Sequence, residues 1–154
     1  MRKLLLTTLV FGIVTVAQET RARADFALGL FLGEPTGLDL KLGMGNRSSL
    51  DIVLGYTTFR DARTGYGHLT YLVTPVVARG SSVLVPLRLG IGAALYGPSE
   101  DIGFAVRAPF EVGLRLRSAP LEFYGEIALA LEVVGTRDDP RLYVQGGLGL
   151  RFYF

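Results

Sequence analysis

The sequence contains no cysteine and no tryptophan, and it contains only one histidine among 154 residues. The absence of cysteine excludes a disulfide framework, a thiolate zinc site, a cysteine nucleophile and a lipid-modified N-terminal cysteine. A single histidine excludes a histidine-rich metal centre. Charged residues are also sparse, at 19%, whereas 49% of the residues are hydrophobic, which is too apolar a balance for a disordered chain. The length suits one domain.

The first residues are typical of a secretory signal peptide. Arg2 and Lys3 precede an uncharged apolar stretch over residues 4–17, which is shorter than the roughly 20 residues of a membrane-spanning helix. An A-x-A cleavage pattern ends at Ala24, and cleavage after Ala17 or an uncleaved anchor are the alternatives. We therefore predict a signal peptide over residues 1–24 and one domain over residues 25–154. This domain has 12 bases and 13 acids and no basic patch, so we expect no nucleic-acid partner.

After residue 25 the apolar residues alternate with a period of two, which predicts β-strands. One face of the predicted strands has 43 positions without a single charge. The opposite face carries eleven charged residues. The predicted strands cover residues 26–33, 37–44, 50–57, 68–74, 83–96, 103–116, 121–133 and 142–154. The eleven charged residues are Asp39, Lys41, Asp51, Arg88, Arg107, Glu111, Arg115, Glu122, Glu126, Glu132 and Arg151.

Three observations favour a membrane barrel over a soluble sheet. Several predicted strands are longer than the 5 or 6 residues common in soluble proteins, and long enough to cross a bilayer. A lipocalin-like carrier would have to fit nearly all of the 43 apolar positions inside eight strands, which have too little room. The chain also ends in Leu150, Phe152 and Phe154, in phase with the apolar face.

The pattern over residues 25–154 resembles the small eight-stranded outer-membrane barrels of the OmpA/OmpX type. The resemblance implies an all-β, eight-stranded antiparallel up-and-down transmembrane β-barrel in the bacterial outer membrane. It also implies that the barrel-assembly machinery reads Phe154, Phe152 and Leu150 as its signal after periplasmic chaperones deliver the chain. The short connections 45–49, 76–82 and 117–120 would then be periplasmic, and the connections 58–67, 97–102 and 134–141 external. Outer-membrane lipids and lipopolysaccharide would surround a monomer.

Eight strands leave a lumen that side chains can fill. If tight hairpins set the registers, Arg88 lies opposite Glu111, and Arg115 lies opposite Glu122. Arg151 would lie diagonal to Glu122 and Glu126. We therefore predict a lumen charge network of Arg88, Glu111, Arg115, Glu122, Glu126 and Arg151 that plugs the barrel.

The function predicted is a structural or surface-interaction role, the latter through charged external stretches at residues 60–66 and 136–140. The first alternative is a porin-like pore for ions or small solutes, and the second is a soluble lipocalin-like carrier of a hydrophobic ligand. Some barrels of this size modify lipid A with a Ser/His/acid set. Here His68 is followed in phase by Thr70 instead of serine, and no acid follows nearby. We therefore expect no enzyme activity, and we interpret His68 as a polar residue at the membrane interface.

Two glycine-rich stretches, at residues 90–95 and 146–149, lie inside predicted strands and not at a strand-to-helix turn. They therefore do not indicate nucleotide binding, and we expect no cofactor.

Overall fold

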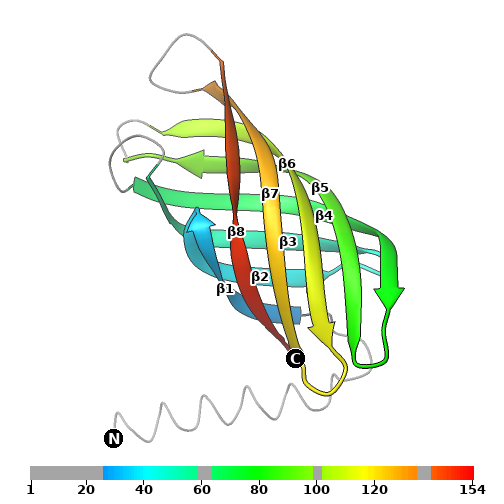
Figure 1. Ribbon diagram of the computed structural model, residues 1–154. Helices are drawn as coiled ribbons and strands as arrows, with labels where there is room; N and C mark the ends of the chain where they lie inside the picture. The colour runs from blue at the N-terminus through cyan, green and yellow to red at the C-terminus, as the bar shows by residue number, and fades with distance from the viewer. Residues whose placement is uncertain (1–25, 59–63, 99–101, 135–139) are drawn as a thin grey trace, which may run out of the picture.

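Eight antiparallel strands form a closed barrel in the computed structural model, in which each strand pairs with the next and β8 pairs with β1 (Figure 1). The structure describes residues 26–58, 64–98, 102–134 and 140–154. The prediction of an all-β, eight-stranded, up-and-down barrel is confirmed. The strands are β1 (Phe26–Glu34), β2 (Thr36–Gly43), β3 (Ser48–Thr57), β4 (Thr64–Arg79), β5 (Val83–Tyr96), β6 (Gly103–Leu116), β7 (Leu121–Val134) and β8 (Arg141–Tyr153).

Some predictions concern residues outside this description. The signal peptide over residues 1–24 and both cleavage positions are among them, as are residues 60–63 and 136–139 of the two charged stretches. In the described part of the chain, no helix has the length and apolar character needed to cross a membrane.

Pairing of the first strand with the last closes the barrel. The β1–β8 ladder runs from Ala27 opposite Tyr153 to Glu34 opposite Gly146. The backbone N–H of Phe154 also donates to the carbonyl oxygen of Phe26 at 2.9 Å, and the rings of these two residues lie 5.6 Å apart. β1 and β8 therefore each have a paired strand on both sides, and neither is an edge strand.

The fourth strand differs from its prediction. It was predicted over residues 68–74, with a turn at 76–82, but β4 continues to Arg79, and only residues 80–82 remain between it and β5. The register shifts between Val73 and Val76, so that two residues of β4 lie opposite one residue of β5. Pro75 lies in this bulge, where its missing N–H removes no ladder hydrogen bond. The sequence prediction ended the strand too early because it treated proline as a terminator.

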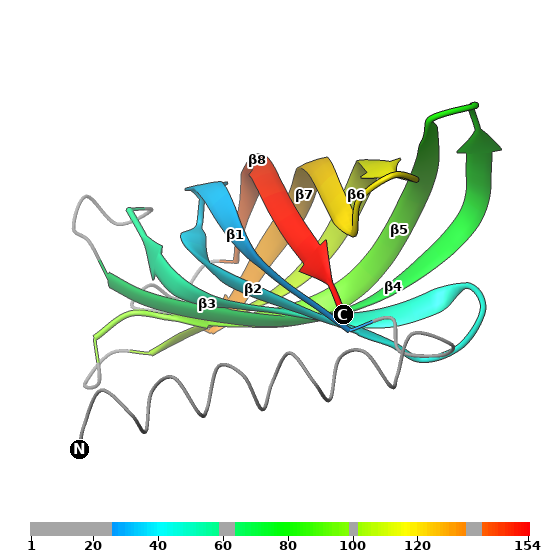
Figure 2. The ribbon, with the colours of Figure 1, turned by 90° about the horizontal axis from the view of Figure 1, so that it is seen from below.

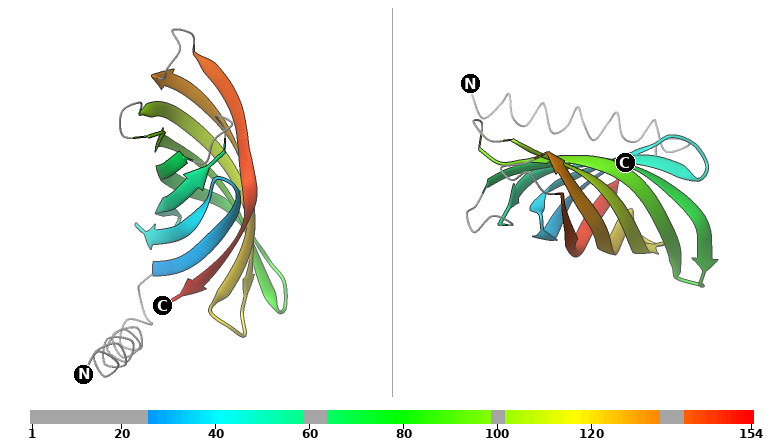
Figure 3. Two further views of the ribbon diagram at one scale, coloured as in Figure 1. Left: turned by 90° about the vertical axis from the view of Figure 1, so that its left-hand side faces the viewer. Right: turned by 90° about the horizontal axis from the view of Figure 1, so that it is seen from above.

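The β4–β5 hairpin projects past the neighbouring turns (Figures 2 and 3). It belongs to the end of the barrel that also holds Phe154 and the connections at residues 44–47 and 117–120. We call this the C-terminal end.

The two faces of the barrel have opposite chemistry. Large apolar side chains point outward and are exposed, among them Leu148 (71%), Ile127 (63%) and Leu38 (66%). Of the eleven charged residues assigned to the inward face, ten are buried, and Arg115 is half-buried. The outward phase of Leu150 and Phe152 is confirmed as well, since both side chains are exposed.

The charged lumen as a candidate functional site

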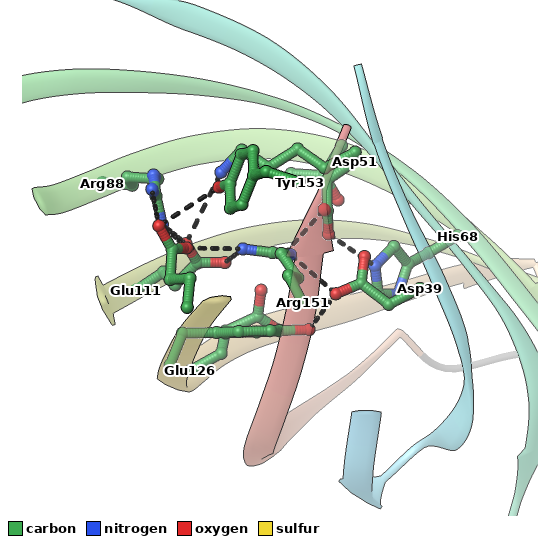
Figure 4. Close-up of polar contacts among 12 residues, drawn as sticks. Asp39, Asp51, His68, Arg88, Glu111, Glu126, Arg151 and Tyr153 are labelled. Atoms are coloured by element: carbon green, nitrogen blue, oxygen red, sulfur yellow. Dashed lines mark hydrogen bonds and ion pairs between the residues drawn. The ribbon is translucent and has the colours of Figure 1, made fainter. Parts of the chain in front are cut away.

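Arg151 is the centre of the lumen. Its guanidinium is fully buried, and it donates from Nε to Asp39 Oδ2 and from Nη2 to Asp51 Oδ1, both at 2.7 Å. Nη1 donates to Glu111 Oε2 at 2.9 Å and lies 3.5 Å from Glu122 Oε1. Figure 4 shows Arg151 between Glu111 on one side and Asp39 and Asp51 on the other. One cation on β8 therefore contacts carboxylates from β2, β3, β6 and β7.

Arg88 forms the second cationic centre. It holds Glu122 with both terminal nitrogens, at 2.7 and 2.8 Å, and it also hydrogen-bonds to Glu111. The hydroxyl of Tyr153 donates to Glu122 at 3.1 Å. Glu111 and Glu122 are thus shared between Arg88 and Arg151. Shared, hydrogen-bonded charges of this kind offset the cost of their burial only while all partners are present.

An aromatic ring supports the Arg151 guanidinium. Tyr124 lies under it, with 3.6 Å between Arg151 Cζ and the ring centre, and the Tyr124 hydroxyl donates to Asp39. Gly149 is the cross-strand partner of Tyr124, and a Cβ built on Gly149 would lie 2.1 Å from the ring. The ring can lie over β8 only because position 149 has no side chain.

This packing predicts that Gly149→Ala will destabilise the barrel by about 1–3 kcal/mol, the usual cost of overpacking a filled core. The Tyr124 ring is buried and stacks on Phe31 with 5.8 Å between centres, so it has little room to move. Urea unfolding of the refolded protein measures the effect. Gly125→Ala is the matched control, because its Cβ would meet its nearest neighbour, Leu148, at an ordinary 3.5 Å. Equal stability of the two variants would contradict the steric argument.

A second cluster is built around Arg107. One terminal nitrogen lies 2.6 Å from His68 Nε2 and donates to Thr70 Oγ1 at 3.2 Å, while the other hydrogen-bonds to Glu126. His68 Nε2 also lies 3.7 Å from Asp51 Oδ2, which connects this cluster to Arg151. The clusters around Arg88, Arg107 and Arg151 thus form one connected network.

The interpretation of His68 as an interfacial residue was wrong. Its side chain is buried in the lumen, with 3% exposure. The prediction began the strand at His68, whereas β4 begins at Thr64, so His68 lies inside the strand and points inward. The acid that the local sequence lacks is Asp51 on β3. It lies directly opposite Thr70, and only the β3–β4 register brings it there.

The structure also tests the predicted pairs. Arg88 lies opposite Glu111, and Arg115 lies opposite Glu122, as predicted. Arg151 lies directly opposite Glu122, not diagonal to it, and Glu126 hydrogen-bonds to Arg107. Six residues, 135–140, separate β7 from β8, which is too many for the tight-hairpin rule to fix this register.

Arg115 lies at the C-terminal end of the lumen, where its guanidinium stacks 3.8 Å from the centre of the Tyr153 ring. The sequence prediction left the inward tyrosines out of the network. Tyr124 and Tyr153 have the same strand phase as the charges, and that phase was the signal available for finding them.

Within the described ranges, no group of three or more histidine, aspartate or glutamate side chains is placed to hold a metal ion. Comparison of the chain with protein families, curated proteins and solved structures found no match.

Proposed function

We propose that this chain is a monomeric integral protein of the bacterial outer membrane, with a structural or surface-interaction role and a lumen plugged by its charge network. The observation that carries the proposal is the inverted distribution of side chains: an exposed apolar exterior around buried charges. Lipid offers no hydrogen-bond partners, so a closed barrel with an apolar exterior suits it. Each arginine or lysine facing lipid at the midplane would cost about 2–4 kcal/mol.

The soluble-carrier alternative is less well supported by the lumen. A carrier of a hydrophobic ligand needs an apolar cavity, but Arg107, Arg151, Glu111 and Glu122 are among the largest fully buried side chains. The same filling favours a plug over a pore, because ionic side chains that hydrogen-bond across the lumen occupy the path that a solute would take.

Delivery and assembly belong to the same proposal. Residues 1–24 would direct secretion, periplasmic chaperones would deliver the chain, and the barrel-assembly machinery would read Leu150, Phe152 and Phe154. Lipids and lipopolysaccharide would then surround the barrel, and the proposed role requires neither a cofactor nor catalysis.

Membrane fractionation followed by gel electrophoresis tests the proposal. We expect the mature protein in the outer-membrane fraction, and we expect its mobility in SDS to change on boiling, because a closed ladder resists detergent until it is heated. Recovery in the soluble periplasmic fraction without a mobility change would instead support the carrier. Planar-bilayer recordings test whether the lumen is plugged. Stable, large conductance from a monomer would contradict the plugged lumen and support the pore.

A further inference from the structure

A cavity of about 240 Å³ opens at the C-terminal end of the barrel. The connection between β2 and β3 borders it on one side, and the projecting β4–β5 hairpin contributes Val77, Leu84 and Pro86 to its wall. By the volume of liquid water, the space would hold about eight water molecules. It is therefore large enough for a small polyatomic ion, either free or as part of a larger molecule.

The cavity lining has charge of one sign. Its cations are Lys41, Arg47, Arg79, Arg88 and Arg115, and among the described residues that line it none is a carboxylate. Glu111 and Glu122 do not line it, and they hydrogen-bond to Arg151 and Arg88, respectively. Asn46, Ser48 and Ser49 add neutral hydrogen-bonding groups. The charged side chains that line this cavity are thus all cationic.

Lys41 gives an independent indication that the cavity takes a ligand. The residue is 4% exposed, yet its ammonium nitrogen has no hydrogen-bond partner among the described residues. Its ion-pair contact is Glu111 Oε1, at 3.8 Å, which is too long for a hydrogen bond. A buried ammonium with three unused N–H donors is costly. An anion in the cavity that Lys41 lines would supply the missing acceptors.

We propose that this cavity binds a phosphate group. Phosphate offers several acceptor oxygens, and the planar fork of a guanidinium matches two of them, while an ammonium acts as a point charge. Arg47 and Arg79 are exposed and would capture the anion at the entrance, and Lys41 would contact it inside. The source is either inorganic phosphate or the headgroup of an anionic phospholipid. The cavity would offer these groups to phosphate whether the barrel lies in a membrane or in solution.

Calorimetric titration of the purified, folded full-length protein tests the site, in nonionic detergent or without it if the protein proves soluble. The probes are inorganic phosphate and short-chain phosphatidylglycerol, with phosphatidylcholine as the zwitterionic control, all at matched ionic strength. We expect saturable binding of a phosphate probe. Arg79→Gln and Arg47→Gln should each weaken it by about tenfold or more, since tenfold is close to the lower limit for a hydrogen bond to a charged group. Lys41→Met should weaken binding while leaving the thermal unfolding midpoint unchanged or higher.

Arg117→Gln is the matched control, because Arg117 is exposed at the same end but does not line the cavity. It should leave binding unchanged. Binding of inorganic phosphate identifies the free ion as sufficient, and binding of phosphatidylglycerol alone identifies the headgroup. The proposal is overturned if neither probe binds saturably, or if phosphatidylcholine binds equally well. It also fails if Arg117→Gln weakens binding as much as Arg79→Gln. Circular dichroism of each variant establishes that it is folded before titration.

Discussion

Replacement of Arg151 by alanine is expected to lower the free energy of unfolding by about 3–5 kcal/mol, the cost of breaking a buried ion pair by removing one partner. The reason is that one guanidinium contacts Asp39, Asp51, Glu111 and Glu122. Its loss leaves Asp39 and Asp51 without their closest cation in a space where water is scarce. A small barrel is stable by only about 5–15 kcal/mol, so the variant should unfold at much lower urea concentration.

Arg115→Ala is the control for this experiment. It removes the same charge from the same face, but at a half-buried position at the C-terminal end. It should therefore cost much less, as for other partly exposed charges. A second variant separates charge from packing: adding Glu111→Gln to Arg151→Met should recover part of the stability lost in Arg151→Met. If Arg151→Ala is as stable as Arg115→Ala, the network is not what holds the lumen together.

Introduction of arginine at Ile127 is the second large expected effect. Ile127 lies in the middle of β7, with its side chain outward and 63% exposed. In a membrane barrel an arginine at this depth costs about 2–4 kcal/mol, whereas one near the interface costs about 0–1 kcal/mol. Val133→Arg is the matched variant, because Val133 has the same strand and face and lies near the strand end. We expect Ile127→Arg to reduce refolding into lipid vesicles strongly and Val133→Arg to reduce it little.

The same pair of variants distinguishes the membrane barrel from the soluble carrier. In water an exposed isoleucine can become arginine at almost no cost, since surface substitutions of this kind usually change stability by less than about 0.5 kcal/mol. A soluble barrel would therefore tolerate both variants equally. Equal refolding of the two in vesicles, with equal recovery from membranes, would contradict the outer-membrane proposal.

The alternation of apolar and charged residues was enough to predict the fold and its two faces. A period of two assigns each residue to one face, so Glu111 and Arg151 could be placed inward without knowing their partners. Neighbouring strands joined by short turns also gave a correct pair in Arg115 and Glu122. These predictions depend only on local geometry, which the order of residues determines directly.

Contacts across the lumen could not be predicted in the same way. Arg151 and Asp51 lie on β8 and β3, separated by 100 positions in the chain, and they meet only because the sheet closes with a particular tilt and stagger. His68 was misplaced because the prediction began the fourth strand at residue 68, whereas β4 begins at Thr64. The room made by Gly149 for Tyr124 likewise depends on the β7–β8 register, which no short turn sets.

The position of Arg151 on the last strand has a consequence for the order of assembly. Asp39, Asp51, Glu111 and Glu122 all precede it in the chain, on strands that can pair with one another before β8 arrives. Until β8 pairs with both β1 and β7, these four acids lack their common cation. The strand that completes the backbone ladder, β8, therefore also carries the cation that these four acids share. Closure of the barrel and the neutralisation of Asp39 and Asp51 by Arg151 therefore depend on the same strand, β8.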